Sequence, residues 1–468
     1  MKQKISAFFK FEERKTNFRA ETVGGLVTFL SMCYILAVNP SMINAAKIPL
    51  GGAFIATAVG AALATIVMAF MANYPVALAP GMGVNAFFTF TICNSIGYSW
   101  QEALAASFIG GVIFLAITFT PLRKKLIDAI PQSLRAAIGA GIGLFIAFVG
   151  LKAAGVIVAD PYGTYVKLGN LGNPKVLVAL FGIVLIFVLY NLKSKVSNFS
   201  FILAILATAL LYALLSLTKV IDHKIVLHKY SDLATFKETF GGFITGFKTF
   251  FQDTTLENGE VFTATAKLVT LPVIIFALVF VDIFDTAGTL VAVTKAANIQ
   301  DEQGNIPNLE KALFADAVGT LISSTLGTPE ITSYVESSTG VESGARTGFS
   351  NLVVAALFLL SIALYPLMAI FKIQEVTAMA LVLVGVLMCE QIADIDWSDK
   401  ASAIACFMTI LMMLLTFSIA DGIAFGFISY AIAKIAQGKP KEVHPLIYIF
   451  SIGFIFYFAF HSLDFKIF

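Results

Sequence analysis

The sequence predicts an all-α polytopic membrane protein, and two observations support this: its composition and the length of its apolar runs. Of the 468 residues, 58% are apolar and only 13% are charged, whereas soluble domains carry about 25% charged residues. Runs long enough to cross a hydrocarbon core about 30 Å thick follow one another along nearly the whole chain. The net charge of +2 gives no reason to expect nucleic acid as a partner. The lipid bilayer is therefore the expected solvent.

The apolar runs predict about fourteen transmembrane helices. The candidate segments are 22–39, 51–73, 80–96, 102–120, 132–151, 175–191, 199–218, 269–294, 309–325, 328–341, 349–371, 376–393, 400–419, 421–436 and 446–461. Several are short for a full crossing. The count is least defined after residue 400, where Asp421 and Gly422 mark either a break inside one bent helix or a turn between two helices.

Lysine and arginine placement predicts the orientation. The stretch 1–21 is charged and lacks a cleavable signal pattern, so we expect it to stay in the mature protein as a cytoplasmic N-terminus. The other basic positions that support this orientation are Arg123, Lys124, Lys125, Arg135, Lys193, Lys195, Arg346, Lys434, Lys439 and Lys441. The long polar stretch 219–268 is then extracellular. It separates two seven-span halves, 22–218 and 269–461, which insert with opposite orientation, as in inverted-repeat transporters.

Two segments interrupt the helical pattern. Residues 79–91 and 326–340 each begin with Gly and Pro and continue for only about ten residues. They are the third spans of their respective halves. Short, Gly/Pro-interrupted spans at matching positions are typical of broken helices around a binding site at the membrane midplane. The free N–H groups at a half-helix N-terminus would suit a polar ligand.

Acidic side chains inside apolar segments are costly and usually functional. Asp282 and Asp285 are three residues apart and share one helix face. Two close carboxylates in a dry environment do not both ionise cheaply, so one of them is expected to hold a proton near neutral pH, which suits a proton-coupled carrier. A structural pair is the alternative. Glu336 lies inside the second broken segment, and Glu330 at its start is open between helix capping and a site role.

Three further observations concern polar and aromatic candidates. Asn85 lies in the first broken segment, and its amide both donates and accepts hydrogen bonds, which fits a heteroaromatic ligand edge. Phe87 could stack on a flat ligand, but with 44 phenylalanines in the chain, packing is the default role of any one of them. Asp316 and Glu390, near span ends, are interpreted as structural.

Several motifs are absent from the sequence. It has no ATP-binding loop and no His-Glu-x-x-His motif, and its four cysteines lack metal-like spacing. We therefore expect neither a cofactor nor a metal, and a transporter rather than an enzyme. An intramembrane aspartyl enzyme is the alternative from another class. A channel is less suited, because two asymmetric broken helices with scattered acids fit alternating access better than a ring-lined filter.

Four stretches resemble those of the AzgA-like purine permeases, a branch of the nucleobase–cation symporters. They are Thr28–Pro40 (TFLSMCYILAVNP), Ala79–Phe88 (APGMGVNAFF), Phe280–Leu290 (FVDIFDTAGTL) and Thr332–Ser337 (TSYVES), with the run Gly344–Gly348 (GARTG) in addition. The resemblance covers most of the chain. It implies a fold like that of the bacterial uracil permease, with two inverted seven-helix repeats and broken third and tenth spans. The implied core domain covers about 22–120 and 269–371, and the implied gate domain about 132–218 and 376–461.

The resemblance also implies uptake of purine nucleobases by proton symport, driven by a proton gradient, across the plasma or inner membrane. The implied substrate-binding residues are Asn85, Asp282, Glu336, Gly83 and Thr332. Asp285, Asp282 and Glu336 are the implied proton-coupling residues, and Glu330, Phe87, Phe280 and Thr289 are further candidates. Pro329 and Glu330 depart from the family pattern of small or hydroxyl residues, and that leaves the match open at 328–331.

Some alternatives stay open. Guanine and hypoxanthine are favoured on family grounds over adenine, but carboxylates accept hydrogen bonds from all three purines. Another small planar or carboxylate solute, such as uracil, urate or sulfate, would also fit the fold. The coupling ion is expected to be a proton, with Na⁺ as the alternative. No residue specifies the oligomeric state, and a homodimer is one option.

Overall fold

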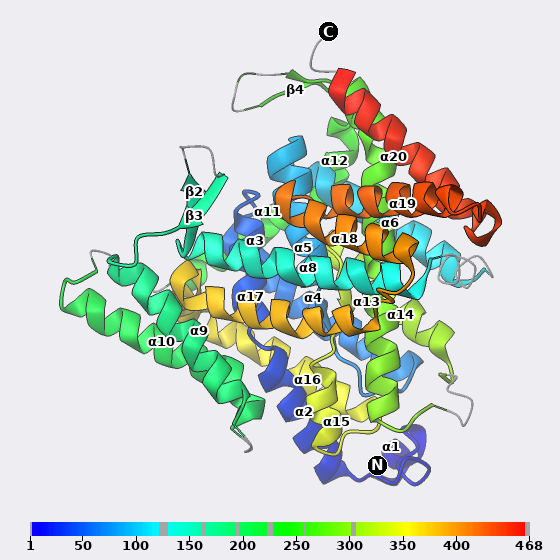
Figure 1. Ribbon diagram of the computed structural model, residues 1–468. Helices are drawn as coiled ribbons and strands as arrows, with labels where there is room; N and C mark the ends of the chain where they lie inside the picture. The colour runs from blue at the N-terminus through cyan, green and yellow to red at the C-terminus, as the bar shows by residue number, and fades with distance from the viewer. Residues whose placement is uncertain are drawn as a thin grey trace.

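The computed structural model describes residues 2–120, 130–160, 165–192, 196–221, 228–256, 259, 261–300 and 306–463. Helices of very different tilt cross one another in this structure, and three short pairs of antiparallel strands connect some of them (Figure 1). The basic residues at 123–125, 193 and 195, on which part of the predicted orientation depends, lie outside the described residues.

The first half of the chain contains seven of the predicted segments. Its elements are α1 (Lys2–Phe8), α2 (Phe18–Met32), α3 (Ile35–Asn44), α4 (Leu50–Met71), β1 (Leu78–Pro80), α5 (Met82–Ala86), the π-helix η1 (Phe87–Ile96), α6 (Trp100–Thr118), α8 (Gln132–Ala153), β2 (Ile157–Asp160), β3 (Tyr165–Leu168), α9 (Pro174–Tyr190), the 3₁₀ turn η2 (Ser197–Phe199) and α10 (Ser200–Leu217). The connection to the second half holds η3 (Tyr230–Thr235), α11 (Phe236–Thr239), α12 (Gly242–Thr249), β4 (Thr254–Thr255) and β5 (Val261–Phe262).

The second half contains the remaining predicted segments. Its elements are α13 (Ala264–Ala296), α14 (Leu309–Leu326), β6 (Ile331–Ser333), α15 (Ser337–Glu342), α16 (Phe349–Leu360), η4 (Ser361–Lys372), α17 (Gln374–Cys389), η5 (Glu390–Asp394), α18 (Lys400–Leu415), α19 (Ile419–Ala436), η6 (Pro440–Glu442) and α20 (Pro445–Leu463). The open question after residue 400 is thereby answered. A turn separates α18 from α19, and the Ser418 hydroxyl caps α19 by accepting from the Asp421 N–H at 3.2 Å.

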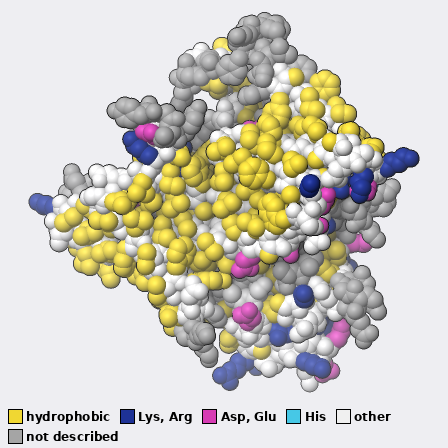
Figure 2. All heavy atoms as spheres, viewed as in Figure 1, with side chains coloured by type: hydrophobic (Ala, Val, Ile, Leu, Met, Phe, Trp, Pro, Cys, Tyr) yellow, Lys and Arg dark blue, Asp and Glu magenta, His cyan; other side chains and the backbone are white. Residues whose placement is uncertain are grey.

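The described helices are those of a multi-pass membrane protein. Within the described ranges, nine helical stretches are long and apolar enough to cross a membrane, and four shorter apolar helices accompany them. Hydrophobic side chains cover much of the face in Figure 2, including the part formed by α9 and α10. There Leu177, Val184 and Leu210 are 51%, 60% and 63% exposed. Water does not favour so broad an apolar surface, but lipid does. The predicted fold class is therefore confirmed.

The helices pack in two groups. In one group α8 lies against α17 and α18, and α9 lies against α10 and α17. In the other, α4 contacts α14 and α16, and α6 contacts α13 and α14. The contacts correspond when the halves are exchanged, since α9 on α17 matches α18 on α8, and α6 on α14 matches α16 on α4. Such a correspondence is what inverted repeats produce. The predicted boundaries of core and gate domains stay a prediction.

The two broken segments meet each other through their backbones. Strands β1 and β6 pair antiparallel, with Leu78 opposite Ser333 and Pro80 opposite Ile331. The Gly81 N–H continues the ladder by donating to the Glu330 carbonyl at 3.0 Å. Gly and Pro interrupt the helices here, and the pairing satisfies the freed backbone groups, as a dry environment requires. Each segment thus begins as a strand rather than as the predicted half-helix, and the second continues only as the six-residue α15.

The run Gly344–Gly348 forms a buried helix cap. The Glu21 carboxylate of α2 is fully buried and accepts from the backbone N–H groups of Arg346 at 2.9 Å and of Ser350 at 3.2 Å. The Asn73 side chain accepts from the Gly348 N–H at 2.8 Å. These N–H groups belong to the first turn of α16 and its approach and have no intrahelical partner. A distant carboxylate therefore fixes the start of α16 against α2 and α4.

A buried ion pair connects the first turn of α13 to α6. The Lys267 ammonium lies 2.7 Å from Glu102 of α6, and the two side chains are 0% and 1% exposed. Lys267 also donates to the Gln252 carbonyl and to the Thr254 hydroxyl, at 2.8 and 2.7 Å. The charge and the three N–H donors of the Lys267 ammonium are thereby satisfied in a dry place. The pair fixes the start of α13 against α6.

We expect Lys267→Met to destabilise the protein by about 3–5 kcal/mol, because the substitution leaves the Glu102 carboxylate buried and unpaired. Thermal unfolding of the purified protein in detergent measures the loss. The Lys10–Glu13 pair, with side chains 56% and 60% exposed, is the control, since Lys10→Met should cost less than about 1 kcal/mol. Equal losses in both variants would contradict the expectation.

Candidate functional site

The two aspartates of α13 lie in different surroundings although they share a helix face. Asp282 is 1% exposed, and its Oδ2 accepts from the Thr320 hydroxyl of α14 at 3.1 Å. Its Oδ1 has no hydrogen-bond partner among the described residues. Asp285, one turn later, is only half-buried. The structure therefore separates an inner and an outer acid that sequence spacing alone placed together.

Asp282 belongs to a buried trio of carboxylates with Asp316 and Glu330, and the three charges interact electrostatically. Glu330 is 1% exposed, and neither of its side-chain oxygens has a partner among the described residues. Asp316 of α14 accepts from the Thr286 hydroxyl at 2.7 Å and from the Ser333 hydroxyl at 3.4 Å. The part of the chain that the structure describes places no lysine, arginine or histidine in ion-pair contact with the trio.

The trio has two consequences for the sequence predictions. Glu330 does not cap a helix, because β6 rather than a helix follows it and its carboxylate makes no backbone contact. Instead its Oε1 lies beside α6, 3.5 Å from where a Cβ on Gly110 would stand. Asp316, interpreted from sequence as structural and near a span end, lies well inside α14 and is fully buried. Among the described residues, no three carboxylate, thiol or imidazole groups are arranged to hold a metal.

Asp285 and Glu336 form a second, half-buried pair. Glu336 stands directly before α15, which packs against α13, and the two carboxylates interact electrostatically. The Tyr34 hydroxyl, at the break between α2 and α3, donates to Glu336 Oε1 at 2.7 Å. A carboxylate has four lone-pair positions. Glu336 can therefore accept further hydrogen bonds. Together, Asp285 and Glu336 offer two carboxylate acceptors, one from α13 and one from the start of α15.

Asn85 is held by an amide network that the sequence analysis did not single out. Asn39 donates from its Nδ2 to the hydroxyls of Thr57 and Thr328, at 2.8 and 2.9 Å. Its oxygen must therefore face Asn85, whose Nδ2 donates to it at 2.6 Å. This fixes the orientation of the Asn85 amide and leaves its Oδ1 without a partner among the described residues. Asn85 thus offers mainly an acceptor here, rather than the even donor and acceptor pair expected.

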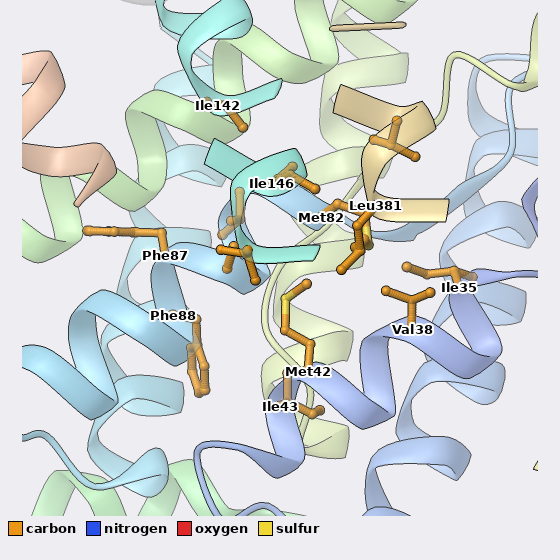
Figure 3. Close-up of a cluster of buried hydrophobic side chains, with 14 of the residues drawn as sticks. Ile35, Val38, Met42, Ile43, Met82, Phe87, Phe88, Ile142, Ile146 and Leu381 are labelled. Atoms are coloured by element: carbon orange, nitrogen blue, oxygen red, sulfur yellow. The ribbon is translucent and has the colours of Figure 1, made fainter. Parts of the chain in front are cut away.

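Gly83 and Phe87 lie where the two groups of helices touch. Figure 3 shows α5 and η1 side chains, including Phe87, near Ile142 and Ile146 of α8. A Cβ added to Gly83 would stand 2.6 Å from Ile142 Cγ2. Phe87 is 1% exposed and packed in this apolar cluster. Both residues therefore form part of the contact between the groups.

The remaining candidates are packed as well. The Thr332 hydroxyl is 2.8 Å from that of Thr286, and Thr332 sits opposite Ala79 in the β1–β6 pair. Phe280 is 4% exposed and meets Phe427 of α19 edge-on, with 5.5 Å between ring centroids. Thr289 is 8% exposed. Thr332 thus supports the trio through Thr286, and Phe280 lies between the helix groups.

Known proteins match this chain over nearly its whole length. A family model described as "Permease family" matches residues 19–425. The chain belongs to this permease family. A putative permease of Methanocaldococcus jannaschii is 41% identical over 98% of this chain and 99% of its own. The guanine/hypoxanthine permease PbuG of Bacillus subtilis is 40% identical over 97% and 100%, and the adenine permease AdeP of Escherichia coli is 37% identical over 96% and 95%.

Solved structures show the same fold at low identity. The transmembrane domain of the cyanobacterial bicarbonate transporter BicA superposes on the permease with a TM-score of 0.58 at 16% identity, covering 86% of this chain and 97% of BicA's. SLC26A9 gives a TM-score of 0.61 at 11% identity, covering 89% and 65%. These proteins share the uracil-permease-like architecture with this chain. The permease is a transporter by family, so the aspartyl-enzyme alternative is set aside.

Proposed function

We propose that the permease takes up purine nucleobases by proton symport, with guanine and hypoxanthine as preferred substrates. The observation that supports this most directly is the half-buried pair of carboxylates, Asp285 on α13 and Glu336 before α15. Relatives that match the chain over nearly its whole length are guanine/hypoxanthine and adenine permeases. The family supports purine nucleobases as the substrate class, and the Asp285–Glu336 pair supports recognition of their N–H groups by carboxylates.

Purines fit two facing carboxylates because they carry N–H donors on both ring edges. A 6-oxopurine has N1–H on its six-membered ring, guanine adds a 2-amino group, and the five-membered ring carries another N–H. Bonds from such donors to ionised carboxylates are the stronger kind. In our proposal Glu336 and Asp285 accept these bonds, and the Asn85 oxygen is a further acceptor. A site rich in acceptors rejects anions such as sulfate and urate by charge repulsion.

The buried trio supports the proton part of the proposal. Asp282 and Glu330 carry oxygens without partners in a place where an unpaired charge is costly. Asp316 instead receives two hydroxyl donors, which suits an ionised carboxylate. We infer that protons neutralise Asp282 and Glu330 while they are enclosed. Asp282 is one helical turn from Asp285, so a proton on the inner acid and a purine on the outer pair would influence each other.

Movement of one helix group against the other would open the site alternately to each side. In our proposal α8–α10 and α17–α20 are the gate, and α2–α6 with α13–α16 are the core. The contact between them in Figure 3 is apolar and includes Ile35, Met42, Ile146 and Leu381. Such surfaces slide without breaking hydrogen bonds. The N-terminus is cytoplasmic in this proposal, and the permease resides in the plasma or inner membrane.

The experiment that tests the proposal is uptake of labelled hypoxanthine into proteoliposomes containing the full chain. We expect accumulation under an imposed inward proton gradient, and only equilibration without it or with a Na⁺ gradient alone. Unlabelled guanine should compete, whereas uracil should not. Competition by adenine alone would indicate an adenine-preferring permease instead. No purine uptake under any gradient would contradict the substrate assignment.

We expect Glu330→Met to raise stability by about 1–4 kcal/mol, because it replaces a buried acid without partners by an apolar side chain of similar length. The same change should reduce gradient-driven purine accumulation if Glu330 shares in proton binding. Thermal unfolding and uptake are measured on the same preparations. Glu390→Met on the exposed turn η5 is the control and should change neither. A stability gain with unchanged accumulation would leave Glu330 without a transport role.

A further inference from the structure

Tyr34 links the half-buried acid pair to the opposite group of helices. It stands between the end of α2 at Met32 and the start of α3 at Ile35, and it is 3% exposed. Its hydroxyl donates to Glu336 at 2.7 Å. Its ring is stacked on Phe201, with centroids 4.7 Å apart and planes 13° apart. One side chain therefore contacts a proposed substrate acceptor at one end and helix α10 along its face.

Both contacts are well anchored. One turn before Tyr34, the hydroxyls of Ser31 and Thr339 are 2.8 Å apart and hold α2 against α15. The Thr339 hydroxyl also donates to the Glu336 carbonyl at 2.7 Å. Phe201 is 6% exposed in the first turn of α10, and α10 packs on α9 and α17. The Tyr34 hydroxyl is thus bonded to the residue directly before α15, in the proposed core. Its ring is stacked on α10, in the proposed gate.

We propose that Tyr34 is a positioning residue that couples the orientation of the Glu336 carboxylate to the position of α10. This inference rests on the proposed function. A displacement of α10 relative to α2 either carries the Tyr34 ring with Phe201 or breaks the stack. Either event alters the charge-assisted bond that orients Glu336. Purine affinity then differs between gate positions, and such differential affinity is what lets substrate binding drive a conformational change.

The experiment is equilibrium binding of hypoxanthine and guanine to the purified full-length permease, with three variants. Tyr34→Phe removes the hydroxyl and keeps the ring, and Phe201→Leu removes the stack and keeps most of the volume. We expect Tyr34→Phe to weaken binding about tenfold, as loss of a hydrogen bond to a charged group does, and Phe201→Leu to weaken it severalfold. The double variant should bind no more weakly than Tyr34→Phe, because both changes interrupt the same chain of contacts.

A matched control is available in the same chain. Phe108 and Phe243 form another stack, with centroids 4.4 Å and planes 16° apart, and neither contacts Glu336. Phe243→Leu by itself should leave purine binding unchanged. Combined with Tyr34→Phe, it should not weaken binding beyond the effect of Tyr34→Phe. Thermal unfolding of each variant tests whether the fold is kept, which is expected because Tyr34→Phe conserves volume and the two Phe→Leu changes keep most of it.

The outcomes separate this inference from the proposed function. Additive losses from Tyr34→Phe and Phe201→Leu in a permease that binds purines would overturn the coupling role alone. Unchanged binding in Tyr34→Phe would overturn it as well. A wild-type protein that binds neither hypoxanthine nor guanine would overturn the proposed function and the inference with it. Sub-additive losses with an inert Phe243→Leu would support both.

Discussion

Replacing Glu336 by Gln is expected to abolish measurable purine uptake, with a loss of at least about a hundredfold. The amide keeps the shape of the side chain but has only one acceptor oxygen, no charge, and an NH₂ group that would face the purine N–H donors. Loss of a hydrogen bond to a charged group costs about 1.5–3 kcal/mol, and an opposed pair of donors adds to this. Asp285→Asn should act in the same way, since the Asp285 carboxylate interacts electrostatically with that of Glu336. Initial rates of hypoxanthine uptake in proteoliposomes measure both.

Asp282→Asn should fail differently. Asp282 is enclosed with Thr320, so we expect the variant to bind purines and to exchange labelled for unlabelled hypoxanthine, while it loses accumulation driven by a proton gradient. Asp394→Asn, on an exposed turn, is the control for a neutralised acid. Full proton-driven accumulation in Asp282→Asn would contradict the proton assignment. Wild-type uptake by Glu336→Gln would contradict the substrate assignment.

The parts of this site that could be predicted are those that depend on the immediate sequence. Acids in an apolar helix are unusual, so Asp282, Asp285 and Glu336 stand out without a structure. Gly and Pro at the start of the third and tenth spans predict interrupted helices, and β1 and β6 interrupt them there. Long apolar runs likewise predict helices, and all the predicted segments coincide with described elements.

The other parts depend on contacts between residues distant in sequence. Asn39, Thr57 and Thr328 are ordinary residues in apolar segments, and only the fold makes them one network around Asn85. The separation of Asp282 from Asp285 could not be predicted either, because both lie on one helix face and the difference arises from what α14 and α15 place beside each. The role of Glu330 stayed open between helix capping and a site role for the same reason, since only the fold shows that a strand paired with β1, and not a helix, follows it.

The contact of Gly83 on α5 with Ile142 on α8 predicts a second variant with a large effect on transport. We expect Gly83→Ala to slow purine transport about tenfold while leaving expression intact. A methyl group at this position would stand 2.6 Å from Ile142 Cγ2, so α5 must move away from α8 or the isoleucine must leave its rotamer. Overpacking of this kind costs about 1–3 kcal/mol. The cost falls on the conformation in which α5 and α8 touch, and it changes the balance among the states of the transport cycle.

Two companion variants distinguish this effect from general damage. Ile142→Ala provides room for the new methyl group, so the Gly83→Ala/Ile142→Ala variant should recover much of the transport rate. Gly453→Ala on α20 places a methyl group with no neighbour within 4 Å and should transport normally. Recovery by Ile142→Ala would show that the contact limits movement between the groups. A slow double variant would instead show that the added Cβ of Gly83→Ala acts through the backbone of α5 itself and not through its contact with Ile142.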